Sequence, residues 1–135
     1  MAEKGSTLRK HVLVAEDNPS TALIMRFHLE HAGLDVTVAR SGIEAWDWLQ
    51  RAHFDLVITD EQMPGMSGLE LCRQIQACPL LRHLPVIMVT AKSYEIEQDA
   101  GADQWGVRQM LSKPFSPQEL VAKVGECLEL TGACP

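Results

Sequence analysis

The stretch Leu56-Val57-Ile58-Thr59-Asp60, followed by the turn-rich Met63-Pro64-Gly65-Met66, decides the fold class. Its run of apolar and β-branched residues predicts a short buried strand that ends at an aspartate. Residues Ser67 to Glu70 then have the pattern of a capping box, which predicts that a helix begins directly after the turn. A strand, a turn and a helix in this order are the unit from which parallel α/β sheets are built.

The same unit recurs on both sides of this stretch. Apolar runs predict strands at 11–15, 36–38, 56–60, 85–89 and 110–112, and helical patterns begin at Pro19, Ser41, Ser67, about Tyr94 and Ser116. The apolar residues of the first helix spread over too wide an arc to show which face is buried. Five strands alternating with five helices predict an α/β fold with a doubly wound parallel sheet covered by helices on both faces.

Composition narrows the class of protein. The chain has 135 residues and a formal net charge of −6, and its Lys and Arg residues are scattered, so we expect no direct contact with nucleic acid. We expect a cytoplasmic protein that does not enter a membrane, because no long apolar run is present and residues 1–10 are polar. We expect one domain over 11–130, with a polar segment at 1–10 and a tail at 131–135. The four cysteines form no CxxC pair and are interpreted as free thiols.

Polar side chains follow four of the five strands. Glu16 and Asp17 come after the first strand, Asp60 ends the third, Thr90 follows the fourth and Lys113 follows the fifth. The carboxyl ends of parallel strands share one edge of a sheet, and ligands bind there. Three carboxylates brought together repel one another unless a cation compensates, and a cluster of oxygen ligands suits Mg²⁺.

A metal ion alone does not account for Lys113 and Thr90. Both are explained by an oxyanion beside the metal, because an ammonium group offers a point charge and a hydroxyl group offers a hydrogen bond. A carboxylate surrounded by metal, lysine and hydroxyl is suited to accept a phosphoryl group, and Asp60 is the expected nucleophile. Taken by itself, the Glu16-Asp17 pair could equally be a solvated loop after a strand.

These segments resemble the receiver domain of two-component response regulators. The resemblance rests on Val12-Leu13-Val14-Ala15-Glu16-Asp17-Asn18, on Leu56 to Asp60 with Met63 to Glu70, on Val89-Thr90-Ala91 and on Lys113-Pro114-Phe115, and it runs from about His11 to Leu130. It implies a flavodoxin-like sheet in the order 2-1-3-4-5. It also implies a phosphorelay in which a histidine kinase or phosphotransfer protein gives its phosphoryl group to Asp60.

The resemblance also implies roles for the other site residues. Asp17 and Asp60 would ligate Mg²⁺ directly, Glu16 would do so mostly through water, and Gln62 would contribute its backbone carbonyl. Thr90 would move to bond a phosphoryl oxygen. Lys113 would pair with the phosphoryl group, and the Lys113-Pro114 bond would be cis. Such a domain is a signalling switch that assists its own phosphorylation and dephosphorylation, and it is not a conventional enzyme.

One position departs from the family pattern. Three residues before the lysine, receivers usually carry an aromatic switch residue, and this chain has Met110. Because Met is flexible, we expect softer coupling between Thr90 and the output surface. That surface would be formed by the helix at about 94–104, the strand at 110–112 and the last helix. It would contact a protein target that the sequence does not identify.

Two other functions were considered. A phosphatase of the haloacid-dehalogenase type would need a second aspartate two residues after the nucleophile, and this chain has Gln62 there. A degenerate receiver that no longer takes up phosphate would be expected to have lost part of the set that is intact here. Only 131–135 follow the last helix, so we expect a receiver that acts alone by docking on another protein.

Overall fold

The computed structural model describes residues 9–91 and 106–128. Within them a five-stranded parallel sheet has the order β2-β1-β3-β4-β5, which confirms the expected topology. The strands are β1 (His11–Ala15), β2 (Asp35–Ala39), β3 (Leu56–Asp60), β4 (Val86–Thr90) and β5 (Val107–Ser112). The helices are α2 (Pro19–His31), α3 (Gly42–Arg51), α4 (Gly68–Ala77) and α6 (Pro117–Leu128). The helix expected at about 94–104 lies outside the described residues.

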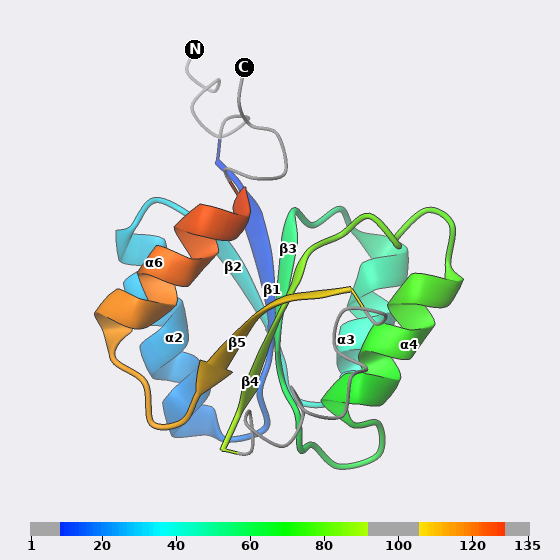
Figure 1. Cartoon of the computed structure of the whole chain (residues 1–135), viewed down its shortest axis with the longest axis horizontal. Helices are drawn as coiled ribbons and strands as arrows, with labels where there is room; N and C mark the ends of the chain where they lie inside the picture. Colours follow the sequence, from blue (N-terminus) through cyan, green and yellow to red (C-terminus); the bar gives the residue numbers. More distant parts are fainter. Residues whose placement is uncertain (1–8, 92–105, 129–135) are drawn as a thin grey trace.

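Helices cover both faces of the sheet, α2 and α6 on one side and α3 and α4 on the other (Figure 1). Because side chains alternate along a strand, each central strand contributes side chains to two separate apolar clusters, one on each face of the sheet. Val12 and Val14 of β1 pack toward α2 and α6, whereas Leu13 and Ala15 pack toward α3 and α4. Both β3 and β4 are buried along their whole length, as expected for central strands of a parallel sheet.

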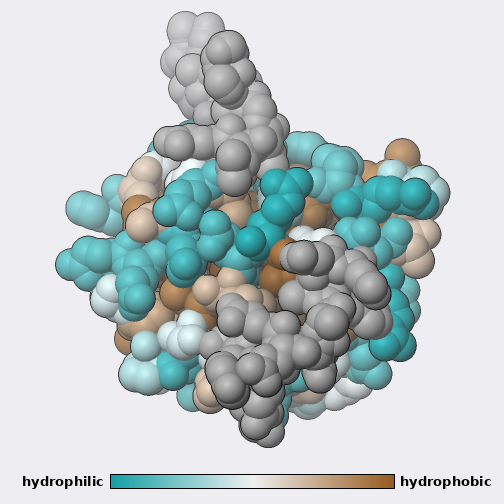
Figure 2. Space-filling view, in the orientation of Figure 1, coloured by the Kyte–Doolittle hydropathy of each residue, from teal (hydrophilic) through white to brown (hydrophobic). Residues whose placement is uncertain are grey.

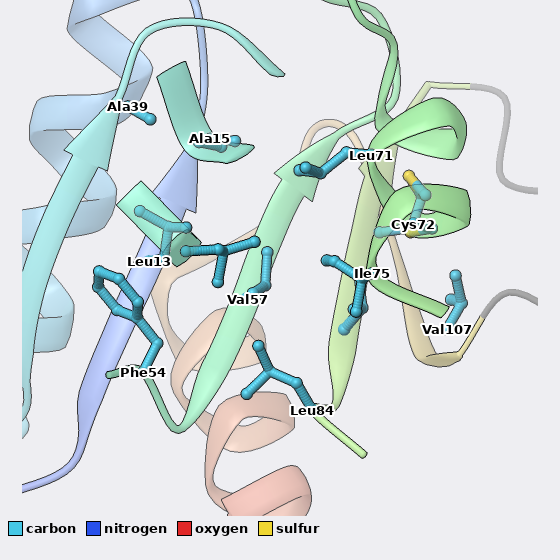
Figure 3. Close-up of a cluster of buried hydrophobic side chains, with 14 residues drawn as sticks. Leu13, Ala15, Ala39, Phe54, Val57, Leu71, Cys72, Ile75, Leu84 and Val107 are labelled. Carbon is cyan, nitrogen blue, oxygen red and sulfur yellow. The ribbon is translucent and has the colours of Figure 1, made fainter. Parts of the chain in front are cut away.

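The side of the sheet that faces α3 and α4 holds a continuous core. Figure 3 shows Leu13 and Val57 of the sheet facing Leu71, Cys72 and Ile75 of α4. Burial raises the pKa of the Cys72 thiol to about 12, so this cysteine behaves as a small apolar residue. Cys72 and Cys78 are free thiols, as expected.

Helix starts follow the predicted capping residues, with one difference. The Asn18 side chain accepts hydrogen bonds from the backbone N–H groups of Ser20 and Thr21 at 2.9 and 3.1 Å, and Ser67 and Glu70 form the complete capping box. Ser41 accepts from the Glu44 N–H at 3.1 Å, but the Glu44 carboxylate accepts from the N–H of Arg40. The α3 box is therefore closed one residue earlier than the pattern predicts.

The fifth strand was predicted too short. It begins at Val107, three residues before the expected start at Met110, directly after Gly106 with its φ of 82°. Arg108 and Gln109 break the apolar pattern because β5 lies at the edge of the sheet and a register shift against β4 falls at Arg108. Hydrophilic side chains cover much of the neighbouring α6 surface in Figure 2.

None of the helices in the part of the chain that the structure describes is long and apolar enough to cross a membrane.

Candidate functional site

Glu16 enters the site because the pairing of β1 and β2 continues one residue past the strand. Its backbone N–H donates to the carbonyl of Ala39 at 2.9 Å, and the residue is only 1% exposed. One carboxylate oxygen, Oε2, accepts from the backbone N–H of Asn18 at 3.2 Å. The turn that starts α2 therefore also holds the buried carboxylate in place.

Asp60 and Lys113 meet across the carboxyl edge of the sheet. Asp60 is the last residue of β3 and is buried, and Lys113 follows β5. The backbone N–H of Lys113 donates to the Thr90 carbonyl at 3.1 Å, which ties the end of β5 to the end of β4. The Lys113 ammonium then lies 3.1 Å from Asp60 Oδ2 and 3.5 Å from Glu16 Oε1. The Lys113-Pro114 bond is cis, as expected.

Three carboxylates gather where the sequence predicts them. Glu16, Asp17 and Asp60 each place one oxygen so that all three atoms lie within 4.8 Å of one another. Glu16 Oε1 is buried and accepts no hydrogen bond from the described residues. A buried carboxylate oxygen without a hydrogen bond is suited to bind a cation. Because all the donor atoms are oxygens, the cluster fits a hard divalent cation such as Mg²⁺.

The pKa shifts of Glu16 and Lys113 show how the charges in the cluster affect one another. The pKa of Glu16 is raised mainly because burial penalises its charged form, and the nearby Asp60 charge adds to this rise. Burial lowers the pKa of Lys113, but its hydrogen bond to Asp60 and the charges of Asp60 and Glu16 outweigh burial, so its pKa is raised. Lys113 is therefore held as a cation by the same carboxylates that it partly neutralises.

The remaining expected site residues lie around this cluster. Thr90 is buried at the end of β4, next to Lys113. Met110 is partly buried in β5, and its side chain packs against the apolar cluster beneath α3 and α4. Gln62 is exposed in the loop two residues after Asp60. The ligand and switch roles of these residues stay predictions.

Sequence reasoning missed an exposed apolar face on α2. Ala22, Met25 and Leu29 face the core, while Leu23, Ile24 and Phe27 are 68%, 52% and 61% exposed. Beside them lies a hollow of about 410 Å³, lined by Thr21, Ile24, Lys113, Pro114 and Phe115. The wide arc of apolar residues was the signal, because a helix that only covers a core needs one apolar stripe. The hollow reaches Lys113 and so adjoins the carboxylate cluster.

This arrangement has a clear chemical capacity. A buried carboxylate beside an ammonium group and a cation site can accept an electrophilic group whose oxygens are negatively charged. The hollow lined by Ile24 and Lys113 adjoins this carboxylate, because Lys113 pairs with Asp60.

Comparison with known proteins agrees with this geometry. The family model of the response regulator receiver domain matches residues 12–125. The chain is 39% identical over 113 residues to the phosphate regulon transcriptional regulatory protein PhoB of Rhizobium meliloti, covering 84% of this chain and 49% of PhoB. The chain thus spans about half the length of the curated relatives it matches.

Solved structures give the same result. The chemotaxis response regulator CheY4 of Vibrio cholerae superposes with a TM-score of 0.82 at 29% identity, covering 89% of this chain and 99% of CheY4. The receiver domain of the sensor histidine kinase PA1611 of Pseudomonas aeruginosa, with a magnesium ion coordinated in its active site cleft, superposes with a TM-score of 0.80 at 28% identity, covering 89% and 98%. The chain belongs to the response regulator receiver domain family.

Proposed function

We propose that Asp60 of this receiver domain accepts a phosphoryl group from a phosphohistidine, and that the phosphorylated form binds a protein target. The observation that carries the proposal is the position of the buried Asp60 carboxylate, 3.1 Å from the Lys113 ammonium and inside a three-carboxylate cluster. We take the receiver unit as 11–130, with 1–10 and 131–135 outside it, and we place its action in the cytoplasm without direct contact with nucleic acid.

The transfer follows from the site residues. An oxygen of Asp60 attacks phosphorus, the P–O bond of an acyl phosphate forms, and the P–N bond to the donor imidazole breaks, leaving the electron pair on nitrogen. Lys113 pairs with a phosphoryl oxygen, and the Thr90 hydroxyl donates a hydrogen bond to another. Asp17, Asp60, the Gln62 carbonyl and, through water, Glu16 would hold Mg²⁺. When bound, this ion supplies positive charge that offsets the carboxylates and the incoming phosphoryl oxygens.

We expect a small phosphodonor to label the protein only when Mg²⁺ is present. The reason is that the carboxylate cluster repels an anion until a cation neutralises it, and Lys113 supplies only one positive charge. Incubation with acetyl phosphate in Mg²⁺ or in EDTA, followed by intact mass spectrometry, measures the phosphoryl adduct. Equal labelling in EDTA would contradict the proposed use of the metal, and labelling in neither condition would contradict the proposed function.

We further propose that the histidine kinase or phosphotransfer protein docks on the exposed face of α2. Ile24→Glu places a charge at the hollow next to Lys113, so it should lower transfer from a phosphohistidine protein by at least about tenfold, the usual effect of losing a central apolar contact. Labelling by acetyl phosphate should not change, because that donor needs no docking surface.

Leu80→Glu is the matched control for this prediction. Leu80 is, like Ile24, an exposed apolar residue, but it lies between α4 and β4, at the end of the sheet opposite to Asp60. Rates of transfer from a phosphotransfer protein that labels the wild type should be unchanged in this variant. Equal rates for both variants would show that the donor approaches over another surface.

The target of the phosphorylated form would bind at the face made by about 94–104, β5 and α6. Within its described part, Gln109 of β5 donates a hydrogen bond to Glu126 of α6 at 3.0 Å. Met110 lies next to Gln109 in β5, two residues before Ser112, the partner of Thr90 in the pairing with β4. We propose that Met110 transmits movement of Thr90 to the target surface, more loosely than an aromatic residue would.

A further inference from the structure

The loop from Glu61 to Ser67 joins the proposed phosphoacceptor to α4 and carries Gln62. Its base is tied to the sheet, because the N–H of Glu61 donates to the Val89 carbonyl at 3.0 Å and the N–H of Gly68 donates to the Glu61 carbonyl at 2.8 Å. The loop is therefore fixed as far as Glu61, and the path of the residues after it, Gln62 included, depends on its other contacts. The contacts of this loop with α3 and α4 therefore determine where Gln62 lies relative to Asp60.

At the α4 end, the loop contacts a glycine that has no room for a side chain. A Cβ atom added to Gly68 would lie 2.3 Å from the Asp60 carbonyl oxygen and 2.9 Å from Glu61 Cα. Its φ is not in the positive range, so space and not backbone conformation requires glycine here. Gly68 thus lets the start of α4 lie directly against the backbone of the phosphoacceptor.

A second glycine holds the loop from outside. Gly42 is the first residue of α3, which lies beside α4 on the same face of the sheet (Figure 1). A Cβ atom on Gly42 would lie 2.3 Å from the Met66 carbonyl oxygen and 2.9 Å from Met66 Cβ. The next residue, Ile43, places Cδ1 only 2.9 Å from the position of a Cβ on Gly65. The first turn of α3 therefore forms the surface against which the loop packs.

Of the two partners in this contact, α3 is the better anchored. Ser41 caps its start, Glu44 binds the N–H of Arg40, and Ala45 and Leu49 are buried in the core. The loop is exposed at 62, 64 and 65, and it is held by hydrogen bonds at its ends and by Met63 and Met66, which pack against the core. When the contact is forced apart, the loop is the part that moves.

We propose that Gly42 is a positioning residue for the phosphorylation site. The missing side chain lets the Met66 carbonyl rest on α3, and this contact sets the path of the loop that leaves Asp60 and presents the Gln62 carbonyl. The inference rests on the proposed function, because it concerns the same metal and phosphoryl site. It adds a residue that contacts neither the carboxylate cluster nor Lys113 within the described residues.

Gly42→Ala tests this inference directly. We expect the Kd for Mg²⁺, measured by isothermal titration calorimetry, to rise by about tenfold, as for other groups that orient metal ligands. The rate of labelling by acetyl phosphate should fall at low Mg²⁺ and recover at saturating Mg²⁺. Because Mg²⁺ would also refold an unstable variant, circular dichroism without Mg²⁺ is needed to show that the Gly42→Ala protein is folded before Mg²⁺ is added. Gly125→Ala is the matched control, because a Cβ on Gly125 in α6 meets nothing within 4 Å.

Ile43→Ala provides a second variant in case Gly42→Ala does not fold. Ile43 is exposed and its loss leaves the core intact, but it removes the side chain that lies over Gly65. We expect a smaller loss of Mg²⁺ affinity in the same direction. The inference is wrong if the folded Gly42→Ala protein keeps the affinity of the wild type, or if Gly42→Ala is unfolded and Ile43→Ala keeps that affinity. If the proposed function itself is wrong, acetyl phosphate does not label the wild type either, which distinguishes that failure from a failure of this inference.

Discussion

Asp60→Asn should remove the phosphoryl adduct completely at every Mg²⁺ concentration. The amide has nearly the same shape as the carboxylate but no anionic oxygen to attack phosphorus, so the nucleophile is lost while the packing is kept. Asp60 is buried at the end of β3 and its environment is already formed by β1, β4 and Lys113, so no neighbouring carboxylate can take its place without moving. Intact mass spectrometry after incubation with acetyl phosphate and Mg²⁺ measures the result.

Asp47→Asn is the control for the loss of one carboxylate. Asp47 lies on the exposed side of α3, where it pairs with Arg51 at 3.0 Å, and it is not part of the carboxylate cluster. Labelling of this variant should equal that of the wild type. An adduct of equal yield in Asp60→Asn would place the phosphoacceptor at another residue and would overturn the proposed chemistry.

Lys113→Met should destabilise the metal-free protein and also slow its phosphorylation. The substitution keeps an aliphatic side chain but leaves the buried carboxylates of Glu16 and Asp60 without their cation. Breaking a buried ion pair costs about 3–5 kcal/mol, and since Lys113 is itself 31% exposed we expect about 2 kcal/mol in the free energy of unfolding. Labelling should slow by about 100-fold, the usual effect of losing one group that stabilises transferred charge.

Urea unfolding with and without Mg²⁺ measures the effect of the substitution on stability. Mg²⁺ should restore part of the lost stability in Lys113→Met, because it brings positive charge to the same carboxylates. Lys123→Met is the control, since the Lys123 ammonium donates a hydrogen bond to the neutral side chain of Gln109, at 3.4 Å, and lies on α6 outside the carboxylate cluster. If both variants unfold at the same urea concentration as the wild type, the carboxylate cluster does not depend on Lys113 for its stability.

The sheet and the carboxylate cluster could be predicted because both depend on local patterns. The strands β1, β3 and β4 are apolar runs, the Glu16-Asp17 pair follows the first of them, and Asp60 ends the second. Once the strands are parallel, their carboxyl ends must meet at one edge, so residues far apart in the sequence converge without further information. The structure bears out the strand order and the convergence of these side chains.

Features that depend on contacts between remote segments could not be predicted. The start of β5 at Val107 depends on pairing with β4, in which Val107 and Gln109 are partners of Val86 and Ile87 and a register shift passes over Arg108. The close approach of Gly42 to Met66 depends on how α3 sits beside α4, and neither residue carries a signal of it. The sequence showed that α2 is apolar over a wide arc, but only the packed structure separates its buried face from its exposed face.

The two faces of α2 have a consequence for how this chain can diverge. Leu23, Ile24 and Phe27 point away from the core, so their replacement changes the free energy of unfolding by only about 0.5 kcal/mol. Met25 and Leu29 on the opposite face remain to hold the helix on the sheet. Duplicated copies of the gene could therefore acquire different donors through a few substitutions on one helix face, and insulation between parallel signalling pathways would arise without loss of the fold.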